Sequence, residues 1–67
     1  MFKVDSRKIR SLMFAQKLNI SALAEKAELQ KSSVSRLITD GATANAQTIG
    51  KLSDALNCDG EELILKE

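Results

Sequence analysis

The stretch that most restricts the fold of this chain lies between residues 19 and 39 and reads NISALAEKAELQKSSVSRLIT. Apolar and small side chains recur there at helical spacing on both sides of a short break, which predicts two short helices folded around one tight turn. Asn19 is a plausible N-cap for the first helix, which should end near Ala27, and the second should run from about Lys31 to about Ile38. The apolar and small positions are Ile20, Leu23, Ala24, Ala27, Leu29, Val34, Leu37 and Ile38.

The second of these helices should expose a polar, partly basic face. Lys31, Ser32, Ser35 and Arg36 point outward together, since positions one, four and five residues apart share a helix face. Long basic side chains can reach guanine acceptors or phosphates, and serine is short enough to let a helix approach base edges. A pair of helices of this kind presents its second helix to the major groove of double-stranded DNA. We therefore predict a helix-turn-helix over about residues 20–39, with base contacts from these four residues.

The flanking segments predict further short helices. One should begin at an Asp5 or Ser6 cap and end near Leu18, and another should cover about residues 46–56. Asp59 could cap a short last helix. The inward positions expected in these three helices are Ile9, Leu12, Met13 and Gln16, then Ile49, Leu52 and Leu56, and finally Leu63 and Ile64.

The stretch Thr39–Asn45 is polar and rich in small residues, so it should be a loop, with a positive φ at Gly41. The tail Leu63–Lys66 could instead be a strand that pairs with Phe2–Val4. The expected fold is thus all-α, with four to five short helices in one domain over residues 1–67 and, as the alternative for the two ends, short terminal strands. Its core must be aliphatic, because the chain has only two aromatic residues.

Composition argues against several classes of protein. No stretch approaches the roughly 20 apolar residues of a membrane span, and the start lacks a signal-peptide apolar region, so we expect a cytoplasmic protein without a membrane partner. A single cysteine, Cys58, rules out an internal disulfide, and the absence of histidine disfavours a zinc site or a catalytic base. We expect no enzymatic activity, metal, cofactor or small-molecule substrate, and a Cys58 that serves as a small buried apolar residue.

The net charge is only +1, but the charges are unevenly distributed. Three acidic residues lie before residue 36. Beyond residue 36 the chain has six acidic residues and two lysines. Such asymmetry suits a one-sided surface for a polyanion, although a solvated surface can show it by chance. The basic residues of the first part include Arg7, Lys8, Arg10, Lys17, Lys26, Lys31 and Arg36.

Over roughly residues 9–64 the chain resembles the lambda-repressor-like, Cro/repressor-type (XRE) helix-turn-helix family. The motifs that carry the resemblance are Ile9-x-x-Leu12, Leu23-Ala24-Glu25-Lys26-Ala27, Ser32-Ser33-Val34-Ser35-Arg36-Leu37, Gly41, Thr48-Ile49 with Leu52, Ala55-Leu56-Asn57-Cys58, and Glu62-Leu63.

The resemblance implies sequence-specific DNA binding by a small transcriptional regulator of the repressor type, from a bacterium, phage or mobile element. Positions matching Lys31, Ser32 and Arg36 touch base edges in such proteins, and those matching Gln30 and Ser33 tend to touch phosphate. The loop before the fourth helix, here Thr43–Asn45, usually follows the DNA backbone, so Thr43 and Asn45 are phosphate candidates. Phosphate contacts fix the register, and base contacts select the sequence.

Three positions depart from the family pattern. Glu28 stands where glycine often forms the turn, so it must become left-handed or the turn must differ, and its charge opposes phosphate. Ile20 replaces a glutamine that often binds phosphate. Met13 replaces a common arginine and is expected in the core.

These departures and the acidic second half support an alternative, a protein-interaction module on the same scaffold that does not bind DNA. RNA binding is disfavoured, because stacking aromatic residues are lacking. If the chain binds DNA, we expect a homodimer, because one small module would bind weakly. Candidate dimer elements are the last helix with Leu63–Leu65 and, secondarily, Phe14. Phe14 either stays partly exposed, which would indicate a partner surface, or folds over Leu18 and the N-terminal segment.

Overall fold

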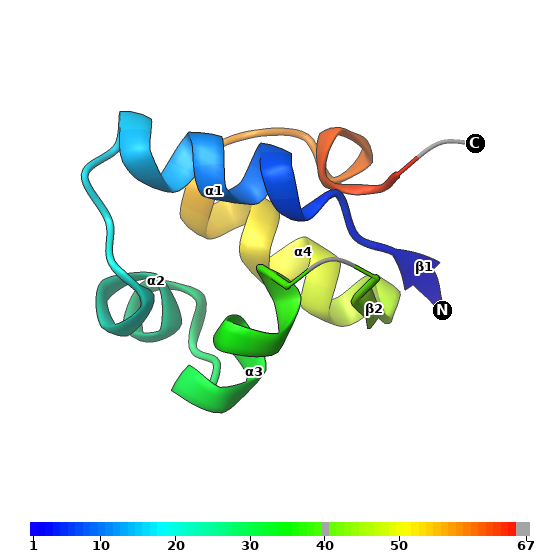
Figure 1. The fold of residues 1–67 in the computed structure, drawn as a ribbon, viewed down its shortest axis with the longest axis horizontal. Helices are drawn as coiled ribbons and strands as arrows, with labels where there is room; N and C mark the ends of the chain where they lie inside the picture. The colour runs from blue at the N-terminus through cyan, green and yellow to red at the C-terminus, as the bar shows by residue number, and fades with distance from the viewer. Residues whose placement is uncertain (40, 66–67) are drawn as a thin grey trace.

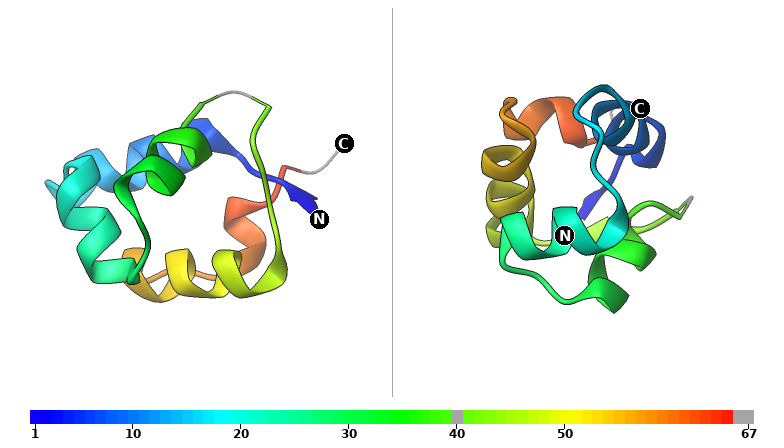
Figure 2. Two further views of the ribbon diagram at one scale, coloured as in Figure 1. Left: turned by 90° about the horizontal axis from the view of Figure 1, so that it is seen from below. Right: turned by 90° about the vertical axis from the view of Figure 1, so that its left-hand side faces the viewer.

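The computed structural model describes residues 1–39 and 41–65 and confirms the all-α class. Four α-helices and a short 3₁₀ helix surround an aliphatic core, and two very short strands lie at one end (Figures 1 and 2). Within the described residues no helix is long and apolar enough to cross a membrane. The elements in chain order are β1 (Phe2–Lys3), α1 (Ser6–Ala15), α2 (Ile20–Ala27), α3 (Lys31–Leu37), β2 (Thr43–Ala44), α4 (Ala46–Leu56) and η1 (Gly60–Leu63).

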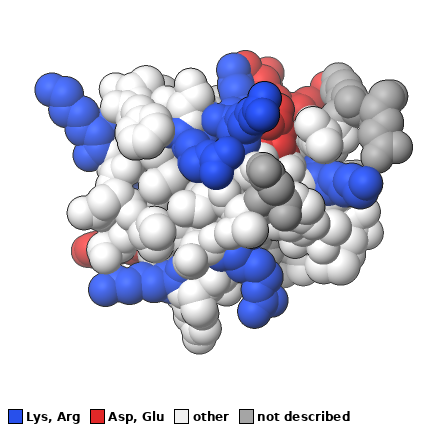
Figure 3. All heavy atoms as spheres, in the orientation of Figure 1, with Lys and Arg blue, Asp and Glu red and all other residues white. Residues whose placement is uncertain are grey.

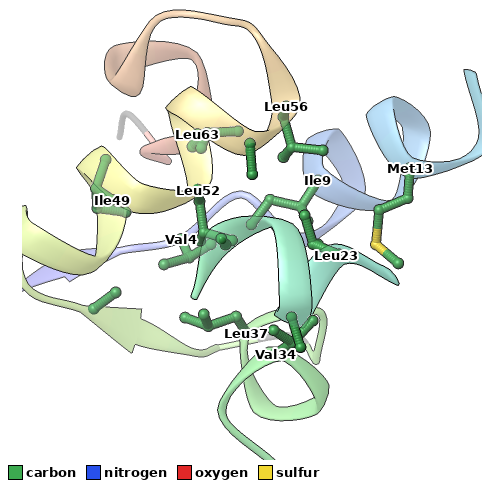
Figure 4. Packing of buried hydrophobic residues seen from close by; sticks show 14 residues of the cluster. Val4, Ile9, Met13, Leu23, Val34, Leu37, Ile49, Leu52, Leu56 and Leu63 are labelled. Atoms are coloured by element: carbon green, nitrogen blue, oxygen red, sulfur yellow. The ribbon is translucent and has the colours of Figure 1, made fainter. Parts of the chain in front are cut away.

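The core is built from aliphatic side chains of every helix. Ile9 of α1, Leu23 of α2 and Leu52 of α4 are fully buried and converge at the centre of the molecule (Figure 4). Both phenylalanines lie outside, with Phe2 42% and Phe14 80% exposed. Burying a side chain such as Leu52 contributes roughly 1.5–3 kcal/mol, so a few aliphatic residues can hold a chain of this size together.

The first helix ends earlier than the sequence pattern predicted. Asp5 is its N-cap and accepts a hydrogen bond from the Lys8 backbone N–H at 3.2 Å, as expected. The helix stops at Ala15 rather than Leu18, because Lys17 adopts a left-handed conformation with φ of 57°. Gln16 still faces inward, and its amide nitrogen donates to the carbonyl oxygen of Leu56 at 2.5 Å. This bond ties the end of α1 to the end of α4.

The helix-turn-helix forms as predicted, with Glu28 in the left-handed conformation (φ 58°) at the end of α2. The Leu29 N–H donates to the Ala24 carbonyl at 2.8 Å and the Glu28 N–H to the Glu25 carbonyl at 3.2 Å. This is the Schellman arrangement, which usually uses glycine at the left-handed position. Ala24 of α2 is 2% exposed and belongs to the core. Asn19 caps α2 through a bond from the Ala22 N–H at 2.7 Å.

The predicted loop Thr39–Asn45 contains a strand that the sequence did not reveal. Gly41 has the expected positive φ of 83°, but Thr43–Ala44 then forms β2, which pairs antiparallel with β1. The tail also pairs with the N-terminal segment, through an antiparallel bridge between Val4 and Ile64. Lys66 lies outside the described residues, so the far end of the expected tail strand is not assigned. The strand β2 was missed because two residues carry too little alternation to distinguish a strand from a loop, whereas β1 falls within the Phe2–Val4 segment offered as a strand.

The last two helices agree closely with the sequence-based expectation. Asn45 caps α4 by accepting from the Thr48 N–H at 2.8 Å. Asp59 caps η1 within a capping box in which the Glu62 carboxylate accepts from the Asp59 N–H at 3.2 Å. Leu63 is fully buried. Its side chain is therefore part of the core and not available for the dimer contact considered above.

Candidate nucleic-acid interface

The outward face of α3 carries the four predicted base-contacting residues. Lys31, Ser32, Ser35 and Arg36 are all exposed on the same helix. On its opposite face, Val34 and Leu37 are 0% and 4% exposed and point into the core (Figure 4). Burial of these two anchors fixes the rotation of the helix, so the four polar residues cannot turn inward.

The C-terminal end of α3 is held by two side-chain bonds. The Thr39 hydroxyl donates to the Ser35 carbonyl at 3.0 Å, and the Arg10 guanidinium donates to the Ile38 carbonyl at 3.1 Å. A helix of seven residues is too short to be stable alone, so these bonds and the buried anchors maintain it. Arg10 of α1 thus supports the C-terminal end of α3.

Three of the four predicted phosphate contacts, Ser33, Thr43 and Asn45, line a hollow of about 130 Å³ beside this face, and Gln30 does not line it. Ser33 and Arg36 from α3 line it on one side, and Thr43 and Asn45, before α4, line it on the other. Met1 and Thr48 also line it, although the sequence predicted no DNA contact for either residue. Gln30, Thr43 and Asn45 are exposed, and Ser33 is half-buried. Gln30 is the N-cap residue of α3 but makes no side-chain cap bond.

Asn45 has two possible roles that its geometry separates. Its side-chain oxygen accepts the Thr48 N–H and so caps α4. The amide nitrogen is a donor, and a phosphate oxygen needs a donor. The same residue can therefore cap the helix with one atom and offer the other to DNA.

Charge on the visible face of the molecule is separated by element (Figure 3). Lys and Arg side chains lie along α1, along α3 and beside the strand pair, whereas the acidic side chains gather mostly near η1. The negative charge of Glu62 in η1 is partly balanced, because its carboxylate lies 3.9 Å from the Lys8 ammonium. The basic half predicted from the sequence thus includes the helix that carries the candidate base contacts.

In a comparison with known families, residues 8–65 match the family model of the Cro/C1-type helix-turn-helix DNA-binding domain. The chain belongs to this family. Family and fold together identify a DNA-binding domain of the kind found in transcription regulators. A comparison with curated protein sequences gives no significant match.

Two solved structures are similar to this Cro/C1-type domain. One is the restriction-modification controller protein C.AhdI from Aeromonas hydrophila, at a TM-score of 0.80 and 27% identity, covering 88% of this chain and 89% of that one. The other is HEPD from Streptomyces albus with 2-hydroxyethylphosphonate and Fe(II) bound, at a TM-score of 0.81 and 27% identity. That match covers 90% of this chain but only 14% of HEPD, so the likeness concerns a small part of the larger protein.

The domain also has an apolar groove of about 500 Å³, which is lined by Met13 and Ile20, two of the three positions noted above as departures. The groove lies at the end of α1 and the start of α2, and Phe14 at its edge is 80% exposed rather than folded down. Ile20, at the position often held by a phosphate-binding glutamine, contributes to its lining. Met13 is 6% exposed and belongs to the core, as expected. Other lining residues are Arg10, Leu18 and Ile38.

Cys58 is half-buried before η1 rather than fully buried. Burial raises the pKa of the Cys58 thiol, and the nearby carboxylates of Glu62 and Asp59 raise this pKa further, whereas Lys8 lowers it. Both main effects favour the neutral thiol, which is a weak nucleophile. Among the residues that the structure describes, no group of three acidic, cysteine or histidine side chains is placed to hold a metal ion.

Proposed function

We propose that this domain binds a specific double-stranded DNA sequence by placing α3 in the major groove, and that it acts as a non-catalytic transcriptional regulator in the cytoplasm. Lys31, Ser32, Ser35 and Arg36 would contact base edges. Gln30, Ser33, Thr43 and Asn45 would contact phosphates. We further propose that residues 1–67 act as one domain, without a cofactor or small-molecule substrate.

One observation carries this proposal: the hollow in which Ser33 and Arg36 adjoin Thr43 and Asn45. Residues from two separate segments meet there beside the exposed face of α3, although nothing in the aliphatic core requires polar side chains at these positions. The arrangement supplies donors for the DNA backbone next to donors for base edges, which is how such domains separate positioning from sequence selection.

The test is a titration of duplex DNA by fluorescence anisotropy at several salt concentrations. Wild-type protein is compared with a Lys31→Ala, Arg36→Ala double variant and with a Lys26→Ala, Lys51→Ala double variant. The control removes the same charge from exposed positions on α2 and α4. We expect the α3 variant to lose most binding and the control to keep it. No binding by folded wild-type protein near 50 mM salt would contradict the proposal.

We also propose that the protein acts as a homodimer. The described part of the molecule is 29 Å along its longest axis. One copy therefore cannot place helices in two successive major-groove turns, which lie about 34 Å apart. Phe14 and the groove beside it offer a protrusion and a recess on the same surface, as an isologous contact with a second copy needs.

The exposed Phe14 also favours a second candidate function, a protein-interaction module without DNA binding. The two functions differ in which surface matters. A Phe14→Ser variant that keeps full DNA affinity and salt dependence would exclude the groove from DNA binding. If folded wild-type protein binds no duplex at all, the interaction module becomes the better explanation.

A further inference from the structure

We propose that Lys3 of β1 contacts the DNA backbone next to the Thr43–Asn45 segment, so that the strand pair adds a phosphate contact to the site. This inference rests on the proposed function. Its basis is the register of the two strands, which places Lys3 directly opposite Thr43.

The strand pair sets the direction in which Lys3 points. Along β2 and its neighbour, Ala42 and Ala44 are buried, whereas Thr43 is exposed. Facing residues of an antiparallel pair share one side of the sheet. Lys3 therefore extends from the same outward side as Thr43, and Val4, the next residue along the strand, points into the core at 3% exposure.

The pairing also brings the two side chains close together. The Val4 N–H donates to the Ala42 carbonyl at 2.9 Å, so the positions that exchange ladder bonds are those on either side of Lys3 and Thr43. These two residues thus form a non-hydrogen-bonded pair, the closer of the two kinds, with Cβ atoms about 4.5–5.5 Å apart. A phosphate held by the Thr43 hydroxyl would lie within reach of a lysine ammonium.

The backbone of Lys3 is fixed on both sides. One edge of β1 faces Thr43, and on the other edge the Lys3 carbonyl accepts the Leu65 N–H at 2.8 Å. The Asp5 N–H bonds to the Leu63 carbonyl at 2.7 Å, which continues this second edge. The charge is therefore presented from an ordered position.

The surroundings of this position are compatible with an anion. Met1 lines the hollow shared by Arg36, Thr43 and Asn45, and its sulfur accepts a long hydrogen bond from the Thr43 hydroxyl at 4.0 Å. Basic side chains lie both along α3 and beside the strand pair (Figure 3). A DNA backbone that follows the hollow would meet Lys3 beyond Thr43.

The test compares the salt dependence of DNA binding by wild-type protein, Lys3→Gln, Lys3→Arg and Lys51→Gln, with thermal melting to verify that each variant is folded. Each lost phosphate contact lowers the slope of log affinity against log salt by about 0.9. We therefore expect the affinity advantage of wild type over Lys3→Gln to shrink about 3-fold between about 50 and 200 mM salt. Lys3→Arg should restore the wild-type slope, and Lys51→Gln should leave it unchanged.

The possible failures are distinguishable. If wild-type protein binds DNA and Lys3→Gln has an unchanged slope, this inference is wrong and the proposed function stands. An equal loss of slope in Lys51→Gln would mean a general charge effect and would also overturn the inference. If folded wild-type protein binds no DNA, the proposed function fails and the Lys3 contact fails with it.

Discussion

At the scale of single residues, three turns of this fold are formed by non-glycine residues in a left-handed conformation. Lys17, Glu28 and Asn57 all have φ near 57°, a region that is unfavourable for most side chains. Asparagine tolerates this conformation, whereas it is unfavourable for lysine and glutamate. Lys17 and Glu28 therefore store strain at the turns that flank α2.

Replacing Glu28 by glycine should stabilise the protein. Relief of the left-handed conformation is expected to raise the free energy of unfolding by roughly 1 kcal/mol. The matched control is Glu25→Gly, which removes the same charge from the interior of α2 and should cost about 1 kcal/mol. Chemical denaturation of both variants measures the difference. Equal destabilisation by the two substitutions would contradict the left-handed assignment.

In DNA titrations, Glu28→Gly should also bind more tightly than wild type, because an acid beside α3 is removed.

Cys58 should react slowly with alkylating reagents in the folded protein. Its raised pKa keeps the thiol neutral at pH 8, and only the thiolate attacks iodoacetamide. The alkylation rate should rise when the protein unfolds in denaturant, and mass spectrometry can follow this rate.

The pKa of the Cys58 thiol is higher in the folded than in the unfolded protein, so the free energy of unfolding should fall as the pH rises from the unfolded pKa to the folded pKa. The Cys58→Ala variant should lose this pH dependence. Equal alkylation rates in folded and unfolded protein would contradict the assignment.

At the scale of elements, the sequence predicted every helix but not every boundary. The bounds of α4 matched the expectation, because Asn45 gives a clear N-cap and Ile49, Leu52 and Leu56 a regular stripe. The end of α1 was wrong, because a lysine in a left-handed turn leaves no glycine signal. The partnership of β1 with β2 depends on a contact about 40 residues apart, which no local pattern contains. The exposure of Phe14 was left open, because packing on the nearby Leu18 and N-terminal segment could not be decided from the pattern, and the structure shows Phe14 80% exposed.

The buried face of α2 should not tolerate a larger residue at Ala24. This side chain is 2% exposed, so Ala24→Leu forces extra volume into a packed core and should cost about 1–3 kcal/mol. Ala22→Leu is the control on the same helix, at a half-buried position, and should be nearly neutral. Thermal denaturation compares the two. A neutral Ala24→Leu would show that the helices have room to separate.

Substitutions at Asn45 can separate its structural role from its proposed contact with DNA. Asn45→Ala removes the cap of α4 and should cost about 1 kcal/mol of stability. Asn45→Asp retains the cap acceptor and adds a negative charge at a helix N-terminus, so stability should be equal or higher. The same charge repels phosphate, so DNA affinity should fall. If Asn45→Asp binds DNA as tightly as wild type, Asn45 acts only as a cap.

At the scale of the whole molecule, the two terminal segments close the fold on themselves. Val4 pairs with Ile64 on one side and bonds to Ala42 on the other, which joins both ends of the described chain to the segment before α4. The side chain of Leu63 is buried in the core, and the backbone of Ile64 pairs with Val4. Of the tail proposed for dimerisation, only Leu65 remains substantially exposed, at 47%.

The homodimer proposal therefore predicts different effects at Phe14 and Leu65, the two exposed apolar residues considered for the dimer contact. Analytical ultracentrifugation of wild-type protein should show a concentration-dependent dimer. Phe14→Ser should shift the equilibrium to the monomer, because Phe14 is the larger and more exposed of the two side chains and stands beside its own recess. Leu65→Ser, a matched loss of one exposed apolar residue, should leave the dimer intact. The reverse result would place the interface at the tail. A wild-type protein that stays monomeric both alone and on an operator duplex would contradict the homodimer but not the DNA-binding fold, since α3 and its supporting contacts lie within one chain.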